Sequence, residues 1–501
     1  MTLAGSHINR IELDMQGEVM NFKTTPYQHQ LDVYECSKDR DFWALFMEMG
    51  TGKSKVVLDQ MAYLYEKGEI DTALIIAPKG VFDTWVQQEI PRHLSDDVPY
   101  KVVRWQPSFT KGFVRDISEI ALPEKREEKF LGVLVMNVEA FSTHKGSQTA
   151  TKFLTLNPNN MVVVDESTTI KTRKAQRTKN LIELSKLAKY RRILTGSPIT
   201  KSPMDLFTQC AFLSPQALGF SSFYSFQGRY AKIERRHGAN RIYPHILGYR
   251  RLDELGDKLD KFSSRILKED CLNLPEKIYM RRNVPLTPEQ TKLYKQMKKL
   301  ALAQLENGEV ASTVNVLTQI MRLQQITCGF LQPDEGELQP IKNNRLQELL
   351  DIVEETDGKV IIWAYWIHDI ELIYAALTAK YGVGSAATYQ GKTPQDERQQ
   401  IIVSFQKKDS PLRFFIGQPQ TGGYGITLTA ANTVIYYSNS YNLEARLQSE
   451  DRAHRIGQTR SVNYVDIVSP DTVDEKILKA LRSKIDIAGT VLGEDIKNWL
   501  I

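Results

Sequence analysis

The sequence has little cysteine and no long apolar segment. Its 501 residues include four cysteines, at positions 36, 210, 271 and 328, without a Cys-x-x-Cys pair, so neither a zinc site nor a disulfide framework is indicated. No stretch approaches the roughly 20 apolar residues that cross a bilayer, and residues 1–17 mix polar and apolar types, unlike a secretory leader. We therefore expect a protein of a reducing cytoplasm with no membrane partner.

Strong charge imbalance and compositional bias are also missing. Apolar residues make up 42% of the chain and charged residues 25%, which are ordinary values for a globular protein of two or three domains. The net charge of +5 is compatible with a nucleic-acid partner but does not establish one. No tandem repeat or low-complexity tract occurs, so the function has to be inferred from local motifs.

Residues 49–54, Met-Gly-Thr-Gly-Lys-Ser, are the most informative stretch of the chain. An apolar run precedes them and a helical pattern follows at 55–67, as is typical of a nucleotide phosphate loop. The glycines let backbone N–H groups turn toward a polyphosphate, Lys53 reaches the β- and γ-phosphates, and the Ser54 hydroxyl joins the Mg²⁺ shell. Met47 stands where the usual first glycine is expected, so an accidental glycine turn is the alternative interpretation.

A pair of acids forms the second motif. The run from Met161 to Val164 is typical of a buried strand, and it ends in Asp165 and Glu166. At the end of such a strand Asp165 can hold Mg²⁺ through its water shell, and Glu166 can polarise the water that attacks the γ-phosphate. Taken alone, the two acids more often cap a following helix. Together with the phosphate loop, they indicate an ATPase.

The segment 451–458, Asp-Arg-Ala-His-Arg-Ile-Gly-Gln, carries two arginines three residues apart. Arg452 and Arg455 therefore share one helix face. Guanidinium groups supply the positive charge and forked donors that a γ-phosphate transition state needs from outside the loop that binds it. A solvated basic helix face is the alternative interpretation. The preceding motifs favour arginine fingers.

Strand and helix signals alternate in two parts of the chain. Short apolar strands are predicted at 73–78, 133–136, 161–164 and 192–195, and again at 359–363, 412–416 and 433–437. This alternation indicates parallel sheets covered by helices on both faces. Between the two parts, long charged amphipathic stretches with few strand signals predict a mostly helical insertion. A closing amphipathic helix is expected at 473–481.

In order and wording, these motifs resemble the Swi/Snf-type DNA translocases, the branch of helicase superfamily two that tracks double-stranded DNA. The matching segments extend over most of the chain and lie at 26–28, 48–54, 75–78 with Trp85, 165–168, 194–199, 420–428 and 451–458. Members of this family commonly lack the first glycine of the loop, which explains Met47. Two departures are mild, since Ser167 and Thr168 follow the acids where a DEAH-like box is usual, and Ser197 replaces a threonine.

The resemblance implies an α/β fold with two RecA-like parallel-sheet lobes and a mostly helical insertion between them. It implies an N-terminal segment and lobe one at 1–200, the insertion at 201–344, lobe two at 345–485 and a C-terminal tail at 486–501. It also implies ATP and Mg²⁺ as cofactors and double-stranded DNA as partner. The oligomeric state is expected to be a monomer.

Residue roles carry over from the family to the matching positions. Nucleotide contacts are implied for Tyr27, Gln28, Met49, Gly50, Thr51, Gly52, Lys53, Ser54, Gly425 and Gln448, and DNA contacts for Lys79, Thr195, Ser197 and Thr421. Catalytic roles are implied for Lys53, Asp165, Glu166, Arg452 and Arg455, and Mg²⁺ binding for Ser54 and Asp165.

We expect an ATP hydrolase that couples hydrolysis to movement along duplex DNA or to its remodelling. A single-strand or RNA helicase is one alternative, but we identify no strand-separating pin, and Trp363 ends an apolar strand and is expected in the core. A catalytically silent ATPase scaffold is another, and intact Lys53, Glu166, Arg452 and Arg455 argue against it. The absence of added nuclease or chromatin-reading segments favours a bacterial, archaeal or phage motor, in the cytoplasm of a bacterium or an infected cell.

Overall fold

The computed structural model describes residues 21–79, 81–122, 128–237, 242–306, 313–333, 335–422 and 426–492. By its contacts the chain divides into two compact units. The first is made of Met1–Phe42, Gly52–Val164 and Glu183–Arg192, and the second of Trp43–Thr51, Asp165–Ile182 and Ile193–Ile501. The phosphate loop is divided between the units, because one boundary falls between Thr51 and Gly52.

The first sheet has seven strands in the order β3-β4-β2-β5-β6-β1-β9. In this order they are Tyr100–Arg104, Leu131–Asn137, Thr72–Ala77, Asn160–Asp165, Tyr190–Leu194, Phe42–Met47 and Ser263–Ile266. β2 pairs in parallel with β4 and β5, β3 with β4, and β1 with β9. Non-consecutive neighbours mean that the chain crosses over between strands, as parallel pairing requires.

The second sheet has six strands in the order β10-β17-β16-β13-β15-β14. In this order they are Lys277–Asn283, Val462–Val468, Ala431–Tyr436, Lys359–Trp363, Phe414–Gly417 and Ala386–Tyr389. Every neighbouring pair is parallel. The α/β fold with two parallel-sheet lobes that the motifs predict is therefore confirmed.

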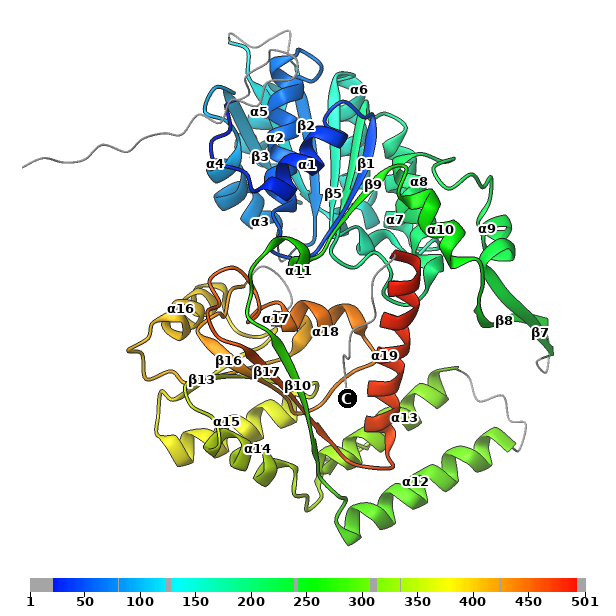
Figure 1. Cartoon of the computed structure of the whole chain (residues 1–501), viewed down its shortest axis with the longest axis vertical. Coiled ribbons are helices and arrows are strands. Elements are labelled where there is room, and N and C mark those ends of the chain that lie inside the picture. Colours follow the sequence, from blue (N-terminus) through cyan, green and yellow to red (C-terminus); the bar gives the residue numbers. More distant parts are fainter. Residues whose placement is uncertain are drawn as a thin grey trace, which may run out of the picture. The chain divides into compact units, whose positions relative to one another are not determined.

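Helices connect the strands of both sheets (Figure 1). In and around the first sheet they are α1 Gln28–Ser37, α2 Lys53–Glu66, α3 Phe82–Thr84, α4 Ile90–His93, α5 Lys111–Ala121, α6 His144–Leu156 and α7 Gln176–Ser185. Next come α8 Leu206–Leu213, α9 Phe223–Tyr230, α10 Leu252–Leu259, α11 Lys268–Cys271, α12 Pro288–Glu306 and α13 Thr313–Cys328. The last are α14 Arg345–Glu354, α15 Ile367–Tyr381, α16 Gln395–Gln406, α17 Pro419–Gly422, α18 Leu443–Glu450 and α19 Val473–Leu492.

The central strand β13 explains why the predicted strands are continuous apolar runs. Val360 and Ile362 lie in one buried cluster, whereas Ile361 and Trp363 lie in another. Successive side chains of a strand point to opposite faces, so both faces of this sheet are covered. Trp363 is completely buried, which confirms that it packs in the core rather than against a nucleic-acid base.

The stretch 201–344 contains strands that its sequence pattern does not predict. β9 joins the first sheet and β10 joins the second, while β7 Ala231–His237 and β8 Ile242–Tyr249 form a separate hairpin. The short pair β11 Phe330–Leu331 and β12 Gln339–Pro340 also lies here. β9 and β10 are sheet edges with polar sequences, so they lack the apolar run by which central strands are recognised.

The final helix is longer than its pattern predicts. The apolar spacing predicts a helix at 473–481, and α19 continues to Leu492. Among the described helices, none combines the length and the hydropathy that a bilayer would need.

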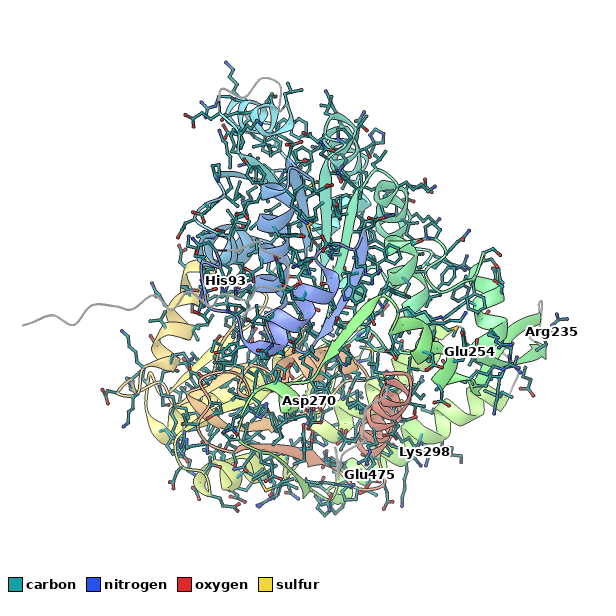
Figure 2. All side chains as sticks on the ribbon, turned by 45° about the horizontal axis from the view of Figure 1, so that its top comes forward. His93, Arg235, Glu254, Asp270, Lys298 and Glu475 are labelled. Carbon is teal, nitrogen blue, oxygen red and sulfur yellow. The ribbon has the colours of Figure 1, made fainter. Side chains whose placement is uncertain are left out.

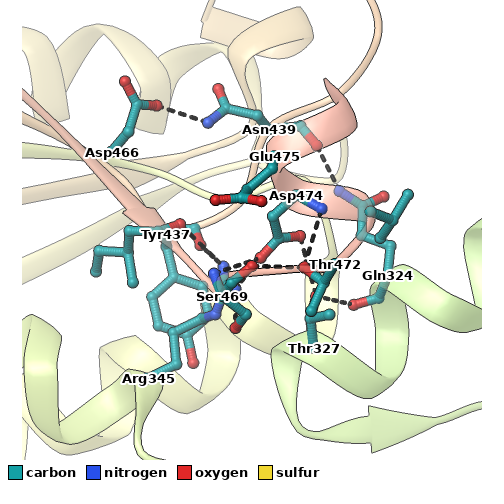
Figure 3. Close-up of polar contacts among 12 residues, drawn as sticks. Gln324, Thr327, Arg345, Tyr437, Asn439, Asp466, Ser469, Thr472, Asp474 and Glu475 are labelled. Atoms are coloured by element: carbon teal, nitrogen blue, oxygen red, sulfur yellow. Dashed lines mark hydrogen bonds and ion pairs between the residues drawn. The ribbon is translucent and has the colours of Figure 1, made fainter. Parts of the chain in front are cut away.

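A buried guanidinium holds one end of the second sheet together (Figure 3). Arg345, at the start of α14, donates to the backbone oxygens of Tyr437 at 2.6 Å and Ile467 at 3.3 Å, and to Ser469 Oγ at 3.1 Å. It also forms an ion pair with Asp474 in the first turn of α19. These contacts connect helices α14 and α19 to the ends of β16 and β17. Removing the arginine would be costly, because several buried acceptors would lose their donor.

Asp369 on α15 is a buried acid of a different kind. It is completely buried, and neither carboxylate oxygen makes a hydrogen bond of good geometry with a described residue, although Cys328 and Ser438 lie close enough to lower its pKa slightly. Burial raises the pKa of Asp369 to about 7, and the positive charge of Arg345 opposes this rise only in part. The folded state therefore favours the protonated carboxyl.

Replacing Asp369 with Asn should make the protein relatively more stable as the pH rises. The folded-state pKa lies above the unfolded one, so the contribution of Asp369 is fully present at low pH and is lost as the pH rises through about 7. The difference in unfolding free energy between Asp369→Asn and the wild type should grow by up to about 4 kcal/mol between about pH 4 and pH 8.

Urea unfolding of both proteins at matched pH values measures this difference. Both proteins have to be measured because burial also raises the pKa of Asp59 to about 7. Asp59 titrates in both proteins, so its contribution cancels in the difference. A difference that does not change with pH would contradict the assignment.

Candidate functional site

The second half of the phosphate loop begins helix α2 in the first unit. Gly52 precedes the helix with φ +93°, and no side chain caps the first turn. Lys53 is buried and Ser54 is half-buried. An uncapped helix N-terminus with its backbone N–H groups is suited to an anion. The local geometry therefore fits a phosphate, as the glycine pattern predicts.

The close approach at Gly52 involves a glutamine that the motif comparison does not single out. A β-carbon at Gly52 would lie 2.1 Å from Gln30 Nε2. The Gln30 side chain is buried, and its Oε1 accepts a hydrogen bond from the Tyr27 backbone N–H at 3.0 Å. By contrast, the predicted nucleotide contacts Tyr27 and Gln28 are exposed, and Gln28 Nε2 donates to Asp32 at 2.8 Å. Gln30 is thus the glutamine of this segment that packs against the phosphate loop.

The first half of the loop lies in the second unit and is fixed by β9 and α11. After β1 ends at Met47, the Glu48 backbone N–H donates to the Ile266 oxygen at 2.9 Å. The Glu48 carboxylate accepts the Lys268 backbone N–H at 2.7 Å, and Thr51 Oγ1 donates to the Glu48 backbone oxygen at 2.7 Å. These bonds hold the turn in which Gly50 has φ +86°.

Asp165 and Glu166 follow β5 directly, as predicted. Asp165 ends the strand, and Glu166 adopts the left-handed conformation with φ 48° and ψ 60°. Both residues are buried, and Asp165 Oδ1 accepts the Glu166 backbone N–H at 2.9 Å. A left-handed residue other than glycine is strained, and such strain persists where surrounding contacts hold it, commonly at active sites.

Hydrogen bonds around the acids connect them to two further segments. Ser167 Oγ donates to Gln209 Oε1 at 2.7 Å, and Gln209 Nε2 donates to the Pro198 backbone oxygen at 2.8 Å. Thr168 Oγ1 and Lys171 Nζ each donate to the Glu444 carboxylate at 2.7 Å. Sequence reasoning missed Gln209 and Glu444, because only the folded chain brings them to the acidic motif.

Both predicted arginine fingers lie near the first half of the loop. Arg452 is buried, its Nη2 donates to Met49 Sδ at 3.1 Å, and its Nη1 donates to the Ile426 oxygen at 3.2 Å. Arg455 Nη1 reaches the same oxygen at 3.3 Å, and its Cβ would lie 3.9 Å from a β-carbon built on Gly50. Burial, with the charge of Arg455, lowers the pKa of Arg452 to about 10. A cation that is already desolvated gains more from an incoming anion.

The second unit contains a small pocket of about 40 Å³, and neither Arg452 nor Arg455 is among its lining residues. It is lined by Glu48, Met49, Glu166, Thr195, Gly196 and Ser197, and by Lys277, Glu444, Leu447, Gln448 and Asp451. This space is enough for a few water molecules. Two of the lining residues, Met49 and Gln448, are among the predicted nucleotide contacts.

The predicted DNA contacts lie in different surroundings. Thr195 is buried and its Oγ1 accepts the Ser197 backbone N–H at 3.1 Å, and both residues line the pocket. Lys79 is exposed, and Thr421 is partly exposed on α17. Gly425, a predicted nucleotide contact, lies outside the described residues.

Lys268 is a buried cation that sequence reasoning missed. Its Nζ donates to Asp451 Oδ1 at 2.6 Å and to the His454 backbone oxygen at 2.9 Å. Burial lowers the pKa of Lys268. Burial alone would raise the pKa of Asp451, but the charges of Lys268 and Lys277 outweigh this and lower it. Because its backbone also bonds Glu48, Lys268 links the phosphate loop to the segment that carries the arginines.

Replacing Lys268 with Met should destabilise the protein by about 2 to 4 kcal/mol, because Asp451 would keep a buried charge with one partner fewer. The double variant Lys268→Met with Asp451→Asn should recover much of this loss, since it removes the uncompensated carboxylate. Chemical unfolding of the two single variants and the double variant measures the coupling.

Lys298→Met serves as the matched control, because Lys298 is an exposed lysine of α12 that points away from the ribbon (Figure 2). It should change stability by no more than about 0.5 kcal/mol. If the losses of unfolding free energy in the two single variants simply add up in the double variant, Lys268 and Asp451 are not coupled. The pair would then not link the phosphate loop to the arginine segment.

Two family models match successive parts of the chain. The SNF2-related domain matches residues 38–330, and the helicase conserved C-terminal domain matches residues 341–457. Together they cover the first sheet, the second sheet except β17, and the phosphate loop, the acidic pair and the two arginines of the site, but not Tyr27, Gln28 and Gln30.

Relatives align with most of this chain but are longer than it. Protein YwqA of Bacillus subtilis is 27% identical over 90% of this chain and 46% of its own length. The DNA annealing helicase and endonuclease ZRANB3 of Mus musculus is 26% identical over 96% of this chain and 42% of its own length. The transcription regulatory protein SNF2 of Saccharomyces cerevisiae is 25% identical over 89% of this chain and 26% of its own length. The chain thus spans less than half of the length of these relatives.

Among solved structures, the Sulfolobus solfataricus SWI2/SNF2 ATPase core in complex with dsDNA aligns with 95% of this chain and 96% of its own, with 23% identity and a TM-score of 0.42.

Proposed function

The chain belongs to the SNF2-related family of ATP-dependent helicases, and from this premise we propose that it hydrolyses ATP to move along double-stranded DNA. The observation that carries the proposal is that Glu166 and Met49 line one pocket, at which Arg452 contacts Met49. A carboxylate that can polarise water thus lines the same pocket as the methionine that a buried arginine contacts, and that arginine can stabilise charge on a phosphoryl group.

We assign the chemical roles as follows. Lys53 and the N-terminus of α2 bind the phosphates, and Glu166 orients and polarises the attacking water. Arg452 and Arg455 stabilise the charge that develops on the γ-phosphoryl oxygens. When ATP binds, we expect a phosphate oxygen to replace the weakly accepting Met49 sulfur as the partner of Arg452.

Ser54 and Asp165 suit Mg²⁺ by their donor chemistry. A hydroxyl and a carboxylate are oxygen donors of the kind that Mg²⁺ takes, and the ion usually keeps several waters and substrate phosphates as its other ligands. Among the described residues, no group of three or more His, Cys, Asp or Glu side chains is arranged to hold a metal alone. Mg²⁺ arriving with ATP would neutralise charge on the β- and γ-phosphates.

For the DNA track we propose Lys79, Thr421, Thr195 and Ser197. Lys79 and Thr421 are accessible to a phosphate backbone. Thr195 and Ser197 line the pocket with Glu166, so contacts of this segment with DNA would transmit directly to the catalytic carboxylate. One of the relatives above, the mouse protein ZRANB3, is a DNA annealing helicase, which agrees with DNA as the partner.

Strand separation is the main alternative activity. A hairpin wedge would be expected near the second sheet, between Arg413 and Asp451. The described residues of this stretch form β15, α17, β16 and α18 and contain no hairpin. We therefore favour translocation on an intact duplex over unwinding.

ATP hydrolysis should be slow without nucleic acid and rise strongly with duplex DNA, because the catalytic groups of a motor of this class become productively arranged on its track. Steady-state ATPase rates with no nucleic acid, duplex DNA, single-stranded DNA and RNA test this. If RNA or single-stranded DNA stimulates the ATPase more than duplex DNA does, the single-strand or RNA helicase becomes the better proposal. If no nucleic acid stimulates it, a catalytically silent scaffold is favoured.

Replacing Arg455 with Ala should spare ATP binding and reduce hydrolysis by roughly 10³-fold or more, the scale of an arginine finger. Arg455→Lys should restore little, because an ammonium lacks the planar fork that spans two phosphate oxygens. DNA-stimulated turnover and equilibrium binding of a fluorescent ATP analogue separate the two effects.

Glu166→Gln serves as the comparison, since it should also bind ATP and fail to hydrolyse it, whereas Lys53→Ala should weaken binding itself. Near-normal turnover in a folded Arg455→Ala protein would mean that this arginine is only a solvated charge.

A further inference from the structure

The positive charge of the chain is concentrated in one short segment. Residues 229–251 contain seven Lys or Arg residues and a single acid, Glu234, which gives a net charge of +6. The whole chain has a net charge of +5, so the other 478 residues together carry a net charge of −1. The rest of the chain therefore carries almost no net charge, and this segment supplies the net positive charge of the protein.

The segment folds into the antiparallel hairpin β7–β8. The hairpin is a two-stranded sheet of its own, separate from both large sheets, with Arg235 opposite Pro244 and Glu234 opposite His245. The hairpin thus presents its residues without adding a strand to either lobe.

Two of its arginines fix the base of the hairpin. Arg250 donates to the backbone oxygens of Gly228 at 2.7 Å and Arg229 at 3.2 Å. Arg229 forms a two-pronged ion pair with Glu254 of α10, at 2.5 and 3.1 Å, and Tyr230 OH donates to the same carboxylate at 3.0 Å. These contacts set the direction in which the hairpin extends.

Two cations farther along β7, Lys232 and Arg235, do not take part in these contacts at the start of the hairpin. Lys232 and Arg235 are exposed, and their side chains make no hydrogen bond or ion pair with any described residue, although their backbones pair with β8. Figure 2 shows Arg235 on the hairpin, pointing away from the ribbon, while Glu254 lies at the base. Three residues apart on one strand, the two side chains lie on opposite faces of the two-stranded ribbon, and neither has a carboxylate partner among the described residues, so each can bind a separate anion.

We propose that the β7–β8 hairpin is a second DNA contact, in which Lys232 and Arg235 bind backbone phosphates of the duplex. This proposal rests on the proposed function and adds a contact outside both parallel sheets. Phosphates along a duplex form a regular row of anions, and a two-stranded ribbon is narrow enough to follow a groove of DNA. The contact gives grip without base recognition, as movement along any sequence requires.

The test is the salt dependence of duplex binding by the double variant Lys232→Ala with Arg235→Ala. If each side chain neutralises one phosphate, the slope of log K against log salt should fall by about 2, at roughly 0.9 per contact. Affinity at about 0.1 M salt should fall at least tenfold. The charge-keeping variants Lys232→Arg and Arg235→Lys should bind like the wild type.

The matched control is Lys111→Ala with Lys408→Ala, which removes the same two charges from exposed positions outside the hairpin. It should leave the slope unchanged. ATP hydrolysis without DNA should be equal in all variants, which verifies that each is folded.

The outcomes separate the two proposals. If the wild type binds no duplex, the proposed function itself fails. If the wild type binds and the hairpin variant keeps the wild-type slope, or if the control variant loses as much, DNA translocation survives and the hairpin contact is refuted. Binding of an acidic protein by the hairpin, without an effect on the duplex slope, would likewise refute it.

Discussion

The site depends on one constraint, the burial of parallel strands on both faces. Such strands expose no side chain along their length, so chemistry is confined to the residues that follow their carboxyl ends. Glu48 follows β1, Glu166 follows β5 and Thr195 follows β6, and all three line one pocket. Residues more than a hundred positions apart in the sequence thus come together at the pocket. The pairing of the strands that precede them aligns them.

The carboxylate of Asp451 at this pocket is paired with two lysines that follow β9 in the chain. Lys268 and Lys277 face Asp451, and Lys268 also bonds a backbone oxygen of the arginine segment. A buried carboxylate is tolerated only with such partners, and with them it fixes the position of its neighbours more firmly than apolar packing would. Arg452 is next to Asp451 in the chain, and its own side chain donates to the backbone oxygens of Gln448 and Ile426.

Sequence reasoning predicts the central strands and the phosphate loop because these have local signatures. The runs at 161–164 and 359–363 are apolar since both faces are buried, and the loop needs glycine where φ is positive. It misses β9 and β10, whose edge positions permit polar residues. It also misses Gln30 and Lys268, because a glutamine or a lysine has no signature of its own and acquires its role only from what the fold places beside it.

The conformation of Glu166 gives the two adjacent acids different surroundings. Along a strand, neighbouring side chains point to opposite faces, so Asp165 and Glu166 would diverge if β5 continued. The left-handed turn at Glu166, held by the bond from its N–H to Asp165, ends the strand and brings its carboxylate to the pocket. Glycine would adopt this turn without strain but would supply no carboxylate. The strain of about 1 to 3 kcal/mol is therefore tied to the function of the residue, and it is compensated by the contacts of the following residues with Gln209 and Glu444.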